Sequence, residues 1–352
     1  MRIFLILFTL VQFNAFASSA FFIEGTHSVA LGKSYDWKTG HGMLMVNKRS
    51  MAKRSFTLKE TDREKSWVSR YGSITFNQLG TEMPNGGVNE KGLVVEMLAL
   101  DESVYSEVDE RPTLNELQWI QYQLDNYESV SEVLSNLKEI RISSAFGKIH
   151  YLVCDSMRVC AVVESLSGEL VTHINGNVLA NNNYAQSLEH LKLFEGFGGT
   201  LPIPTDNTSL SRFVKMSEAL RVFRSGQRNN VIESSFTLLN TVRHSFKEEG
   251  NTTVWNIVYD LTSKKIHFAH TLVGIKRFIE FSELDYSCLT PRKVYNIESH
   301  QGESNIAEDL IKYKKSLNQR IIQLSLKDRE SELPPKTLEK LALLPETFSC
   351  QE

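Results

Sequence analysis

Short apolar runs separated by glycines fill the first hundred residues of the chain, and they require a fold built around β-sheet. Runs of this kind occur at residues 21–23, 28–31, 43–46, 72–77 and 92–98. Gly25, Gly32, Gly40 and Gly42 separate the first three of them. This pattern is typical of hairpins in an antiparallel sheet. We therefore predict that the N-terminal third of the chain is mainly strand.

Beyond this region, blocks of helical spacing and blocks of strand spacing follow one another. The predicted helices are 114–125, 129–137, 211–224 and 231–242, and the predicted strands are 150–153, 159–164, 169–174, 254–259 and 265–270. Thr113 is expected to cap the first helix, with Glu116 at the capping-box position. Because the elements come in blocks and not as βαβ units, the chain is predicted to be an α+β protein of stacked layers.

Residues 301–352 differ in composition from the preceding part and are rich in Lys, Glu and Leu. Their apolar residues step by three or four positions through Ile306, Leu310, Tyr313, Leu317, Ile321 and Leu324. This spacing predicts one helix with an apolar stripe, packed on the body of the protein or on a second subunit of a homo-oligomer. Pro334-Pro335 is expected to end that helix. The predicted division is a signal segment at 1–17, one domain at 18–300 and a C-terminal helical extension at 301–352.

The first 17 residues have the pattern of a secretory signal peptide. An apolar segment at 3–13 is followed by Ala15-Phe16-Ala17, a small-x-small cleavage signature. The alternative interpretation is a buried N-terminal strand or helix. Ser18-Ser19-Ala20 overlaps as a second cleavage pattern, so that one cut frees Ser18 and the other frees Phe21. The signal peptide predicts an exported protein, periplasmic or secreted. No later stretch approaches 18 apolar residues, so we expect no membrane span in the mature chain.

The four cysteines bear on the same question of compartment, since an exported chain meets oxidising conditions. Cys154 and Cys160 flank a polar turn between two strand-like runs. A cross-strand disulfide and two buried free thiols are both compatible with that arrangement. The pairing of Cys288 and Cys350 cannot be read from the sequence.

Charge and motifs exclude several classes of function. The formal net charge of −3 provides no basic surface for nucleic acid. The common nucleotide-binding and metalloprotease motifs are absent from the sequence. His267 and His270 have an odd spacing within a strand-like run, which places them on opposite faces and disfavours a shared metal. We therefore expect neither a metal nor an organic cofactor.

The most informative chemistry lies at Ser18 and in the hairpin that follows it. A serine at a free N-terminus has its hydroxyl beside its own α-amine, whose ordinary pKa of about 7.7–8.0 leaves a useful neutral fraction to act as a base. Nucleophile and base then belong to one residue. The hairpin ends in Gly32-Lys33-Ser34-Tyr35-Asp36-Trp37, which brings Asp36 back beside residue 18, where a carboxylate can orient the amine.

An ordered series of segments from residue 18 to about residue 285 resembles one protein family. The segments are Gly32–Trp37, Val46–Arg49, Gly72–Gln78, Gly87–Leu93, Trp119–Asn126, Arg141–Ser144, Leu179–Tyr184, Ser211–Phe213 and Val254–Tyr259. They are similar to the choloylglycine hydrolase/penicillin V acylase family of N-terminal-nucleophile hydrolases, in the branch of linear amide C–N hydrolases. The resemblance implies an αββα sandwich and hydrolysis of a linear amide without metal or cofactor.

The resemblance also implies roles for individual residues. Ser18 falls where the family has its catalytic cysteine, and Asp36 matches the aspartate that holds the nucleophile. Asn181 matches the asparagine whose side-chain amide contributes to the oxyanion hole, and a backbone N–H near Ala99 is the implied second donor. Arg212 matches an arginine that supports this network.

Three positions depart from the family pattern. A serine hydroxyl replaces a thiol, and a hydroxyl is much harder to ionise than a thiol with a pKa near 8.5. Lys33 stands where many members have arginine, which removes the planar fork of the guanidinium. Ala99 lacks the aromatic or polar side chain that some relatives place in the pocket, which alters substrate fit but leaves a backbone donor.

Together these observations predict an exported amidohydrolase that cleaves a linear, non-peptide amide through an acyl-enzyme on Ser18. The implied substrates are small N-acyl amides, such as penicillin V-like amides, conjugated bile acids or acyl homoserine lactones. The alternative is a catalytically silent family member that acts as a binding or scaffold protein. The serine at the nucleophile position and the overlapping cleavage site favour that alternative, whereas Asp36, Asn181 and Arg212 favour the enzyme.

Overall fold

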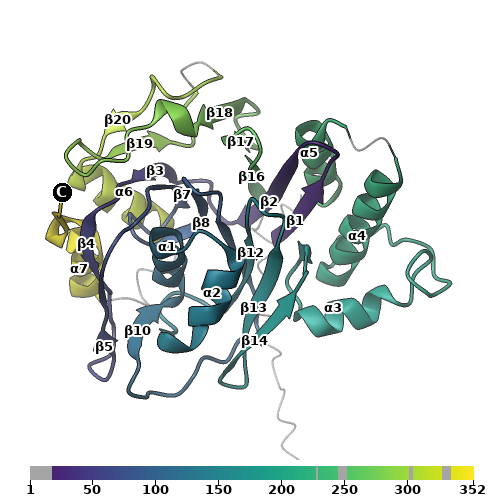
Figure 1. Cartoon of the computed structure of the whole chain (residues 1–352), viewed down its shortest axis with the longest axis horizontal. Helices are drawn as coiled ribbons and strands as arrows, with labels where there is room; N and C mark the ends of the chain where they lie inside the picture. The colour runs from purple at the N-terminus through teal and green to yellow at the C-terminus, as the bar shows by residue number, and fades with distance from the viewer. Residues whose placement is uncertain (1–17, 227–228, 245–251, 301–303, 327–333) are drawn as a thin grey trace, which may run out of the picture.

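The computed structural model describes residues 18–226, 229–244, 252–300, 304–326 and 334–352 (Figure 1). The signal segment expected at 1–17 lies outside the described residues. Two sheets form the centre of the molecule, and helices cover their outer faces.

The smaller of the two central sheets begins with the first described residue of the chain. Its strands in spatial order are β15 (Val178–Leu179), β1 (Ser18–Glu24), β2 (Val29–Trp37), β16 (Thr252–Asp260), β17 (Lys265–His270) and β18 (Lys276–Glu280). Adjacent strands of this sheet pair antiparallel. In the β1–β2 hairpin Ser18 is opposite Tyr35, so Asp36 lies one position beyond the partner of Ser18.

The larger sheet has nine strands. Their spatial order is β14 (Glu169–Ile174), β13 (Cys160–Leu166), β12 (Ile149–Cys154), β9 (Val94–Ala99), β8 (Pro84–Asn89), β7 (Ser73–Asn77), β3 (Met43–Asn47), β19 (Lys293–Asn296) and β20 (Ile311–Lys312). There are two further sheets of three strands among the described residues. One consists of β11 (Arg141–Ser143), β10 (Pro112–Asn115) and β5 (Arg63–Glu64). The other consists of β21 (Ser349–Cys350), β4 (Met51–Arg54) and β6 (Ser66–Val68).

Helices complete the outer layers. They are α1 (Glu116–Asn126), α2 (Val130–Asn136), α3 (Tyr184–Leu191), α4 (Ser209–Ser225), α5 (Val231–Thr241), α6 (Lys315–Leu326) and α7 (Pro335–Leu343). Helices α4 and α5 contact β1, and α1 contacts β8 and β9 of the other sheet. Figure 1 shows α3, α4 and α5 grouped on one side, with α1 and α2 over the nine-stranded sheet. This order of layers confirms the predicted α+β class and the αββα sandwich.

The core lies between the two sheets. The ring of Phe76 on β7 meets those of Tyr259 on β16 and Phe268 on β17 edge-on, with centroids 6.3 and 5.6 Å apart. Strand β1 is covered on both faces, which explains why its apolar residues run continuously and do not alternate. Gly32 is required opposite Phe21, because any Cβ at that position would overlap the Phe21 ring.

The start of α1 differs from the expectation. Thr113 lies within β10, where it pairs with Arg141, and the extended chain continues to Asn115. The Asn115 side chain then caps the helix by accepting from the N–H groups of Leu117 and Gln118 at 3.1 and 2.8 Å. The prediction that Thr113 forms a capping box with Glu116 is therefore wrong, because tertiary pairing of β10 moves the helix start.

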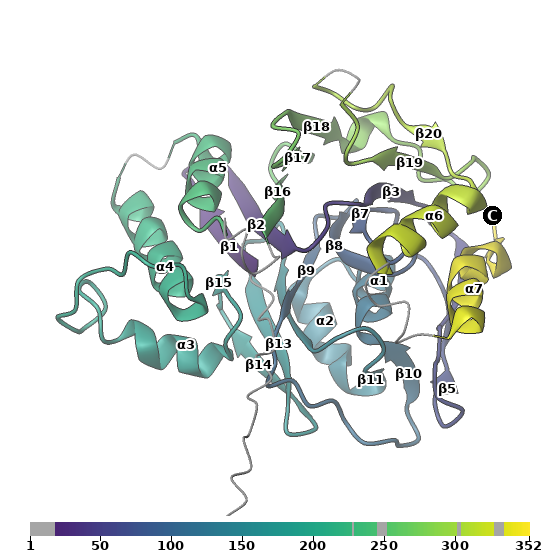
Figure 2. The same ribbon diagram turned by 180° about the vertical axis from the view of Figure 1, so that it is seen from behind.

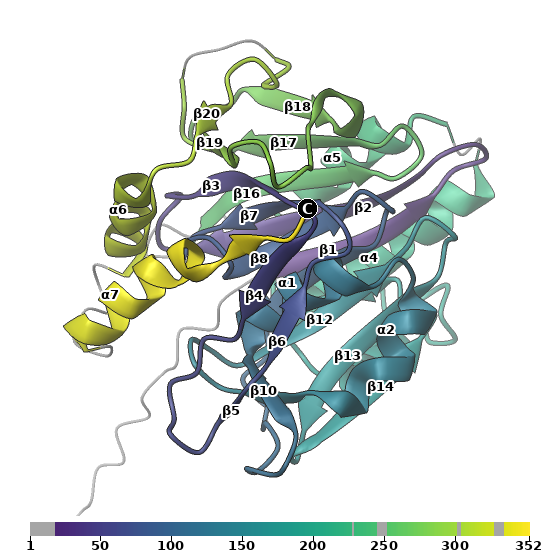
Figure 3. The same cartoon turned by 60° about the vertical axis from the view of Figure 1, so that its left-hand side comes forward.

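The C-terminal region is also less helical than its spacing predicts. Helix α6 begins only at Lys315, and Ile306 is buried in a loop whose backbone pairs with Phe278 of β18. Residues 311–312 join the nine-stranded sheet through β19. Pro335 begins α7, since proline suits the first turn of a helix; the segment between Leu326 and Pro334, where the predicted helix was expected to end, lies outside the described residues. The chain end lies beside β4 (Figure 3), with which β21 pairs.

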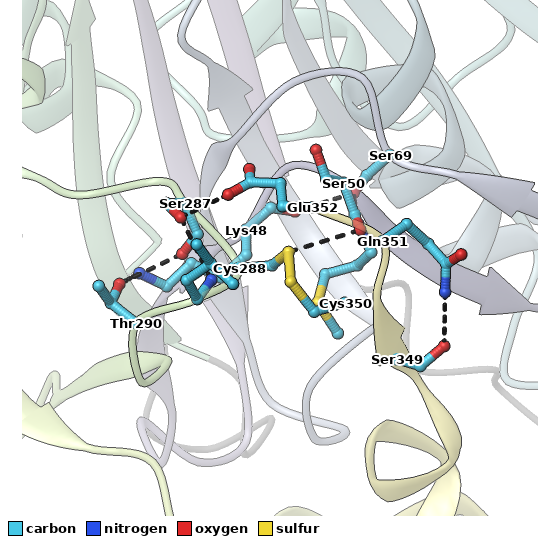
Figure 4. The surroundings of a disulfide bond; sticks show 12 residues. Lys48, Ser50, Ser69, Ser287, Cys288, Thr290, Ser349, Cys350, Gln351 and Glu352 are labelled. Carbon is cyan, nitrogen blue, oxygen red and sulfur yellow. Dashed lines mark hydrogen bonds between the residues drawn. A yellow bond between two sulfur atoms is a disulfide. The ribbon is translucent and has the colours of Figure 1, made fainter.

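All four cysteines form disulfides. Cys154 and Cys160 are direct partners in the β12–β13 ladder, so the free-thiol alternative is wrong. Cys288 pairs with Cys350 and joins a loop of the body to the last strand (Figure 4). Beside this bond, the N–H of Gln351 donates to the carbonyl of Ser50 at 2.8 Å. In the part of the chain that is described, every helix is too short or too polar to cross a membrane.

Candidate active site

A cavity of about 210 Å³ opens beside the first described residue of β1. Ser18, Asp36 and Ala99 line it, together with apolar side chains that include Trp37, Leu117 and Phe146. The strands β1, β2 and β9 bring the first three residues together, although they are far apart in sequence. Four of the six predicted site residues, Ser18, Asn181, Arg212 and Ala99, are joined directly by hydrogen bonds.

Asn181 and Arg212 hold the backbone of Ser18 from two sides. The N–H of Ser18 donates to Asn181 Oδ1 at 2.8 Å. Arg212 reaches down from α4 and donates through Nη1 to the Ser18 carbonyl at 2.5 Å and to Ser19 Oγ at 2.7 Å. Its Nη2 donates to Asn181 Oδ1 at 2.7 Å. A planar guanidinium can serve all three acceptors at once, which fixes the end of β1 relative to Asn181.

Asn181 is itself positioned by two backbone contacts. Its Nδ2 donates to the carbonyl of Ala99 at 2.9 Å, and its own N–H donates to Ser209 Oγ at 2.7 Å. A side-chain amide nitrogen carries two hydrogens, so the bond to Ala99 leaves one for a ligand. The predicted contribution of this amide to an oxyanion hole is therefore compatible with the geometry.

The carboxyl group of Asp36 is completely buried, and only half of it has a partner. Oδ1 accepts from Thr253 Oγ1 at 2.5 Å. Oδ2 has no hydrogen-bond partner among the described residues. Burial raises the pKa of Asp36 to about 6, although the nearby Arg212 and Lys33 charges and the Thr253 hydroxyl act in the opposite direction. Ionisation of this carboxyl group is thus unfavourable, and Oδ2, which lacks a partner among the described residues, can accept a hydrogen bond from a donor beside it.

Lys33 lies beneath the site and takes no part in lining the cavity. Its Nζ donates to the carbonyl of Met97, and burial lowers its pKa to about 8 against the opposing charges of Glu96 and Asp36. Glu96 is also buried, which raises its pKa to about 7, and its Oε1 accepts from the Tyr259 hydroxyl at 2.5 Å. Lys33 therefore places a buried amino group close to the carboxyl groups of Glu96 and Asp36, and its supporting role stays a prediction.

Glu116 anchors one wall of the cavity. Its carboxylate accepts from the backbone N–H groups of Ala145, Phe146 and Gly147 at 2.8, 2.5 and 2.5 Å. Phe146 and Gly147 themselves line the cavity. Glu116, which the sequence analysis placed at the capping-box position of Thr113, thus holds a loop of the pocket in place.

A second buried pair supports the segment that carries Asn181. His150 contacts Glu164 Oε1 through Nδ1 at 2.9 Å and the carbonyl of Ala180 through Nε2 at 2.8 Å. Glu164 also accepts from the N–H of Tyr184 at 3.0 Å. This pair therefore ties the residue before Asn181 to the nine-stranded sheet.

Sequence reasoning missed Thr253, Glu96, Glu116 and the pair His150–Glu164 as parts of the site. Glu96 had a usable signal, because it is a lone carboxylate within an apolar strand-like run. Thr253 had none. Within the described ranges, no group of three or more His, Cys, Asp or Glu side chains is arranged to hold a metal ion.

Comparison with known proteins identifies the family. The sequence model of one protein family, described as linear amide C–N hydrolases, choloylglycine hydrolase family, matches residues 21–277, which are well over half of the chain. The chain belongs to the choloylglycine hydrolase family of linear amide C–N hydrolases. The resemblance seen in the sequence is thereby confirmed. The matched residues include Asp36, Ala99, Asn181 and Arg212, and they begin shortly after Ser18.

Individual relatives agree with this assignment. Penicillin V acylase from Pectobacterium atrosepticum is 30% identical over 170 residues, which are 43% of this chain and 45% of the acylase. The match thus spans less than half of that relative. The structure of penicillin V acylase from Agrobacterium tumefaciens has a TM-score of 0.74 at 26% identity, covering 84% of this chain and 98% of the other.

A more distant structure shares the fold. A single-residue variant of conjugated bile acid hydrolase from Clostridium perfringens has a TM-score of 0.68 at 16% identity, covering 81% of this chain and 98% of the other. Within this family the roles inferred for Ser18, Asp36, Asn181 and Arg212 stay predictions.

Proposed function

We propose that the mature chain is an exported amidohydrolase that begins at Ser18 and cleaves a linear amide bond of a small N-acyl substrate. One observation carries the proposal: the nitrogen of Ser18 donates to Asn181 at the edge of a cavity that Asp36 also lines, and Asp36 Oδ2 has no hydrogen-bond partner among the described residues. Removal of residues 1–17 would convert that backbone nitrogen into a free α-amine in the same place.

The reaction needs a base, and the α-amine supplies it. In its neutral form it takes the hydroxyl proton of Ser18 while Oγ attacks the amide carbonyl. The protonated amine then delivers the proton to the leaving nitrogen, and the acyl ester stays on Oγ until water hydrolyses it by the same acid–base sequence. Asn181 Oδ1 accepts one hydrogen of the amine, and Asp36 Oδ2 is the available acceptor for another.

Charge develops on the carbonyl oxygen during the attack, and the proposal assigns its stabilisation to two donors. One is the second hydrogen of Asn181 Nδ2, and the other is a backbone N–H near Ala99. Arg212 has no free role in this step, because its guanidinium already contacts Ser18, Ser19 and Asn181. We assign it to positioning.

The size and lining of the cavity support a small apolar acyl group as the part of the substrate that binds there. Relatives named as penicillin V acylases agree with an N-acyl amide as the substrate class. Two disulfides support export to an oxidising compartment. Homo-oligomer formation stays a prediction.

The test begins with mass spectrometry of the mature protein, which should start at Ser18. Incubation with a panel of N-acyl amides should then add an acyl mass to the N-terminal peptide. Ser18→Ala should lower kcat by about a thousandfold or more while the protein stays folded. Ser28→Ala, in the turn after β1, is the matched control and should retain activity.

The silent binding protein is the second candidate, favoured by the serine that replaces the expected thiol. It predicts a mature chain that starts at Phe21 or retains Met1, or one that starts at Ser18 and forms no acyl-enzyme with any amide. Ser18→Cys separates the candidates further, because a thiol should raise the rate of an assembled site and add nothing to a protein without one.

A further inference from the structure

Helix α6 takes part in the cavity that contains Ser18. Ser325 and Leu326, at its C-terminal end, line the cavity from a position about 300 residues away in sequence. Leu326 is only 3% exposed. Both residues lie beyond residue 277, where the family match ends. The wall that they form therefore belongs to a part of the chain outside the matched family region.

Specific contacts hold α6 against the body. Ile321 and Leu317 pack with Met43 and Met45 of β3 and with Val294 of β19. Figure 2 shows α6 lying along the edge of the molecule near β3 and β7. Of the stripe predicted from the sequence, Leu317 and Ile321 thus pack on the body of the protein within α6, whose C-terminal end lines the cavity.

A buried amide connects this helix to another wall of the same cavity. Asn318 Oδ1 accepts from the N–H of Thr81 at 2.9 Å, and its Nδ2 donates to the carbonyl of Ala342 in α7 at 3.1 Å. Thr81 belongs to the loop between β7 and β8, in which Gln78 and Leu79 line the cavity. Helix α6, helix α7 and this loop are therefore joined through one side chain.

The two cavity residues of α6 offer different chemistry. Leu326 presents an apolar side chain. Ser325 Oγ is buried without a hydrogen-bond partner among the described residues. An unpaired hydroxyl in an apolar setting is unfavourable, and an oxygen of a bound ligand would satisfy it.

We propose that the C-terminal extension determines acyl specificity, with Leu326 limiting the length of the acyl group and Ser325 binding an oxygen atom carried by it. The inference rests on the proposed function, because it takes the cavity as the acyl site. The corresponding substrate is an N-acyl amide with a short apolar acyl group that bears an ether, keto or hydroxyl oxygen.

The experiment measures binding, so that it does not depend on turnover. Straight-chain carboxylic acids of increasing length are titrated against the mature full-length protein, with Trp37 fluorescence as the signal, since Trp37 lines the cavity. Leu326→Ala should move the tightest binding to acids about two or three methylenes longer, with each buried methylene changing Kd about fourfold. Leu326→Phe should move it to shorter acids, and it remains informative if the alanine variant does not fold.

Leu324→Ala is the matched control, because Leu324 lies on the same helix outside the cavity lining. Its length profile should equal that of the wild type. Ser325→Ala should weaken acids that carry an ether oxygen by about fivefold to tenfold and leave hydrocarbon acids unchanged. The inference is overturned if the Leu326 and Leu324 variants share one profile, or if no acid binds the wild-type protein. Failure of the proposed function is a separate result, namely absence of an acyl-enzyme while these binding shifts are observed.

Discussion

Replacement of Asp36 by Asn should stabilise the protein at high pH while it impairs the site. The carboxyl group is buried, one oxygen accepts from Thr253 and the other has no partner among the described residues. Burial raises its pKa from the ordinary 3.8 to about 6. Asn keeps an oxygen for the Thr253 hydroxyl, has nearly the same shape and carries no charge to desolvate.

The sign and size follow from proton linkage. The folded state keeps its proton up to about pH 6, whereas the unfolded state loses it near 3.8, so the free energy of unfolding falls as the pH rises through this window. This shift in the pKa of Asp36 lowers the free energy of unfolding of the wild type by roughly 3 kcal/mol at pH 8 and by less than about 1 kcal/mol at pH 4. Relative to the wild type, Asp36→Asn should therefore gain about 2 kcal/mol between pH 4 and pH 8.

Urea denaturation of both proteins at pH 4 and pH 8 measures this change, and amide turnover at pH 8 measures the loss of activity. Asp101→Asn is the control, since Asp101 also lines the cavity but is exposed. The difference in unfolding free energy between Asp101→Asn and the wild type is the baseline for the loss of a cavity carboxyl group. The reasoning is refuted if the stability difference between wild type and Asp36→Asn is the same at both pH values, or if the variant loses stability at pH 8.

Three further predictions concern neighbouring contacts. Arg212→Lys removes the planar guanidinium that binds Ser19 through one nitrogen and Asn181 through the other. The positions of β1 and Asn181 then become less well fixed, so kcat should fall at least about tenfold in steady-state assays with little change in KM. Glu116→Ala deprives the backbone amides up to Gly147 of their acceptor, and hydrogen exchange should show them exchanging at least about tenfold faster than in the wild type. Cys350→Ser opens a loop with a sequence separation of 62, and the free energy of unfolding should fall by up to about 4 kcal/mol in the loop-closure model; an unchanged thermal midpoint would contradict this.

Much of the fold could be predicted because it depends on local patterns. The hairpin that carries Lys33 and Asp36 follows from alternating apolar runs and glycines, and helices α4 and α5 follow from their spacing. The predictions failed where tertiary contacts override local preference. Glu116 has the capping-box position relative to Thr113 in the sequence, but pairing of β10 moves the helix start, and the Glu116 carboxylate binds the loop at 145–147.

The sequence by itself determined the hairpins near the N-terminus, helices α4 and α5, the family and the residue types placed at the site, because periodicity and motif spacing are properties of neighbouring residues. The tertiary structure alone decided which of those residues meet. Ser18 contacts Asn181 and Arg212 across separations of 163 and 194 positions. The Asp36 oxygen that has no partner in the described part of the chain and the wall formed by Leu326 likewise result from how sheets and helices pack. Such contacts depend on the burial and geometry of whole layers, which no local pattern records.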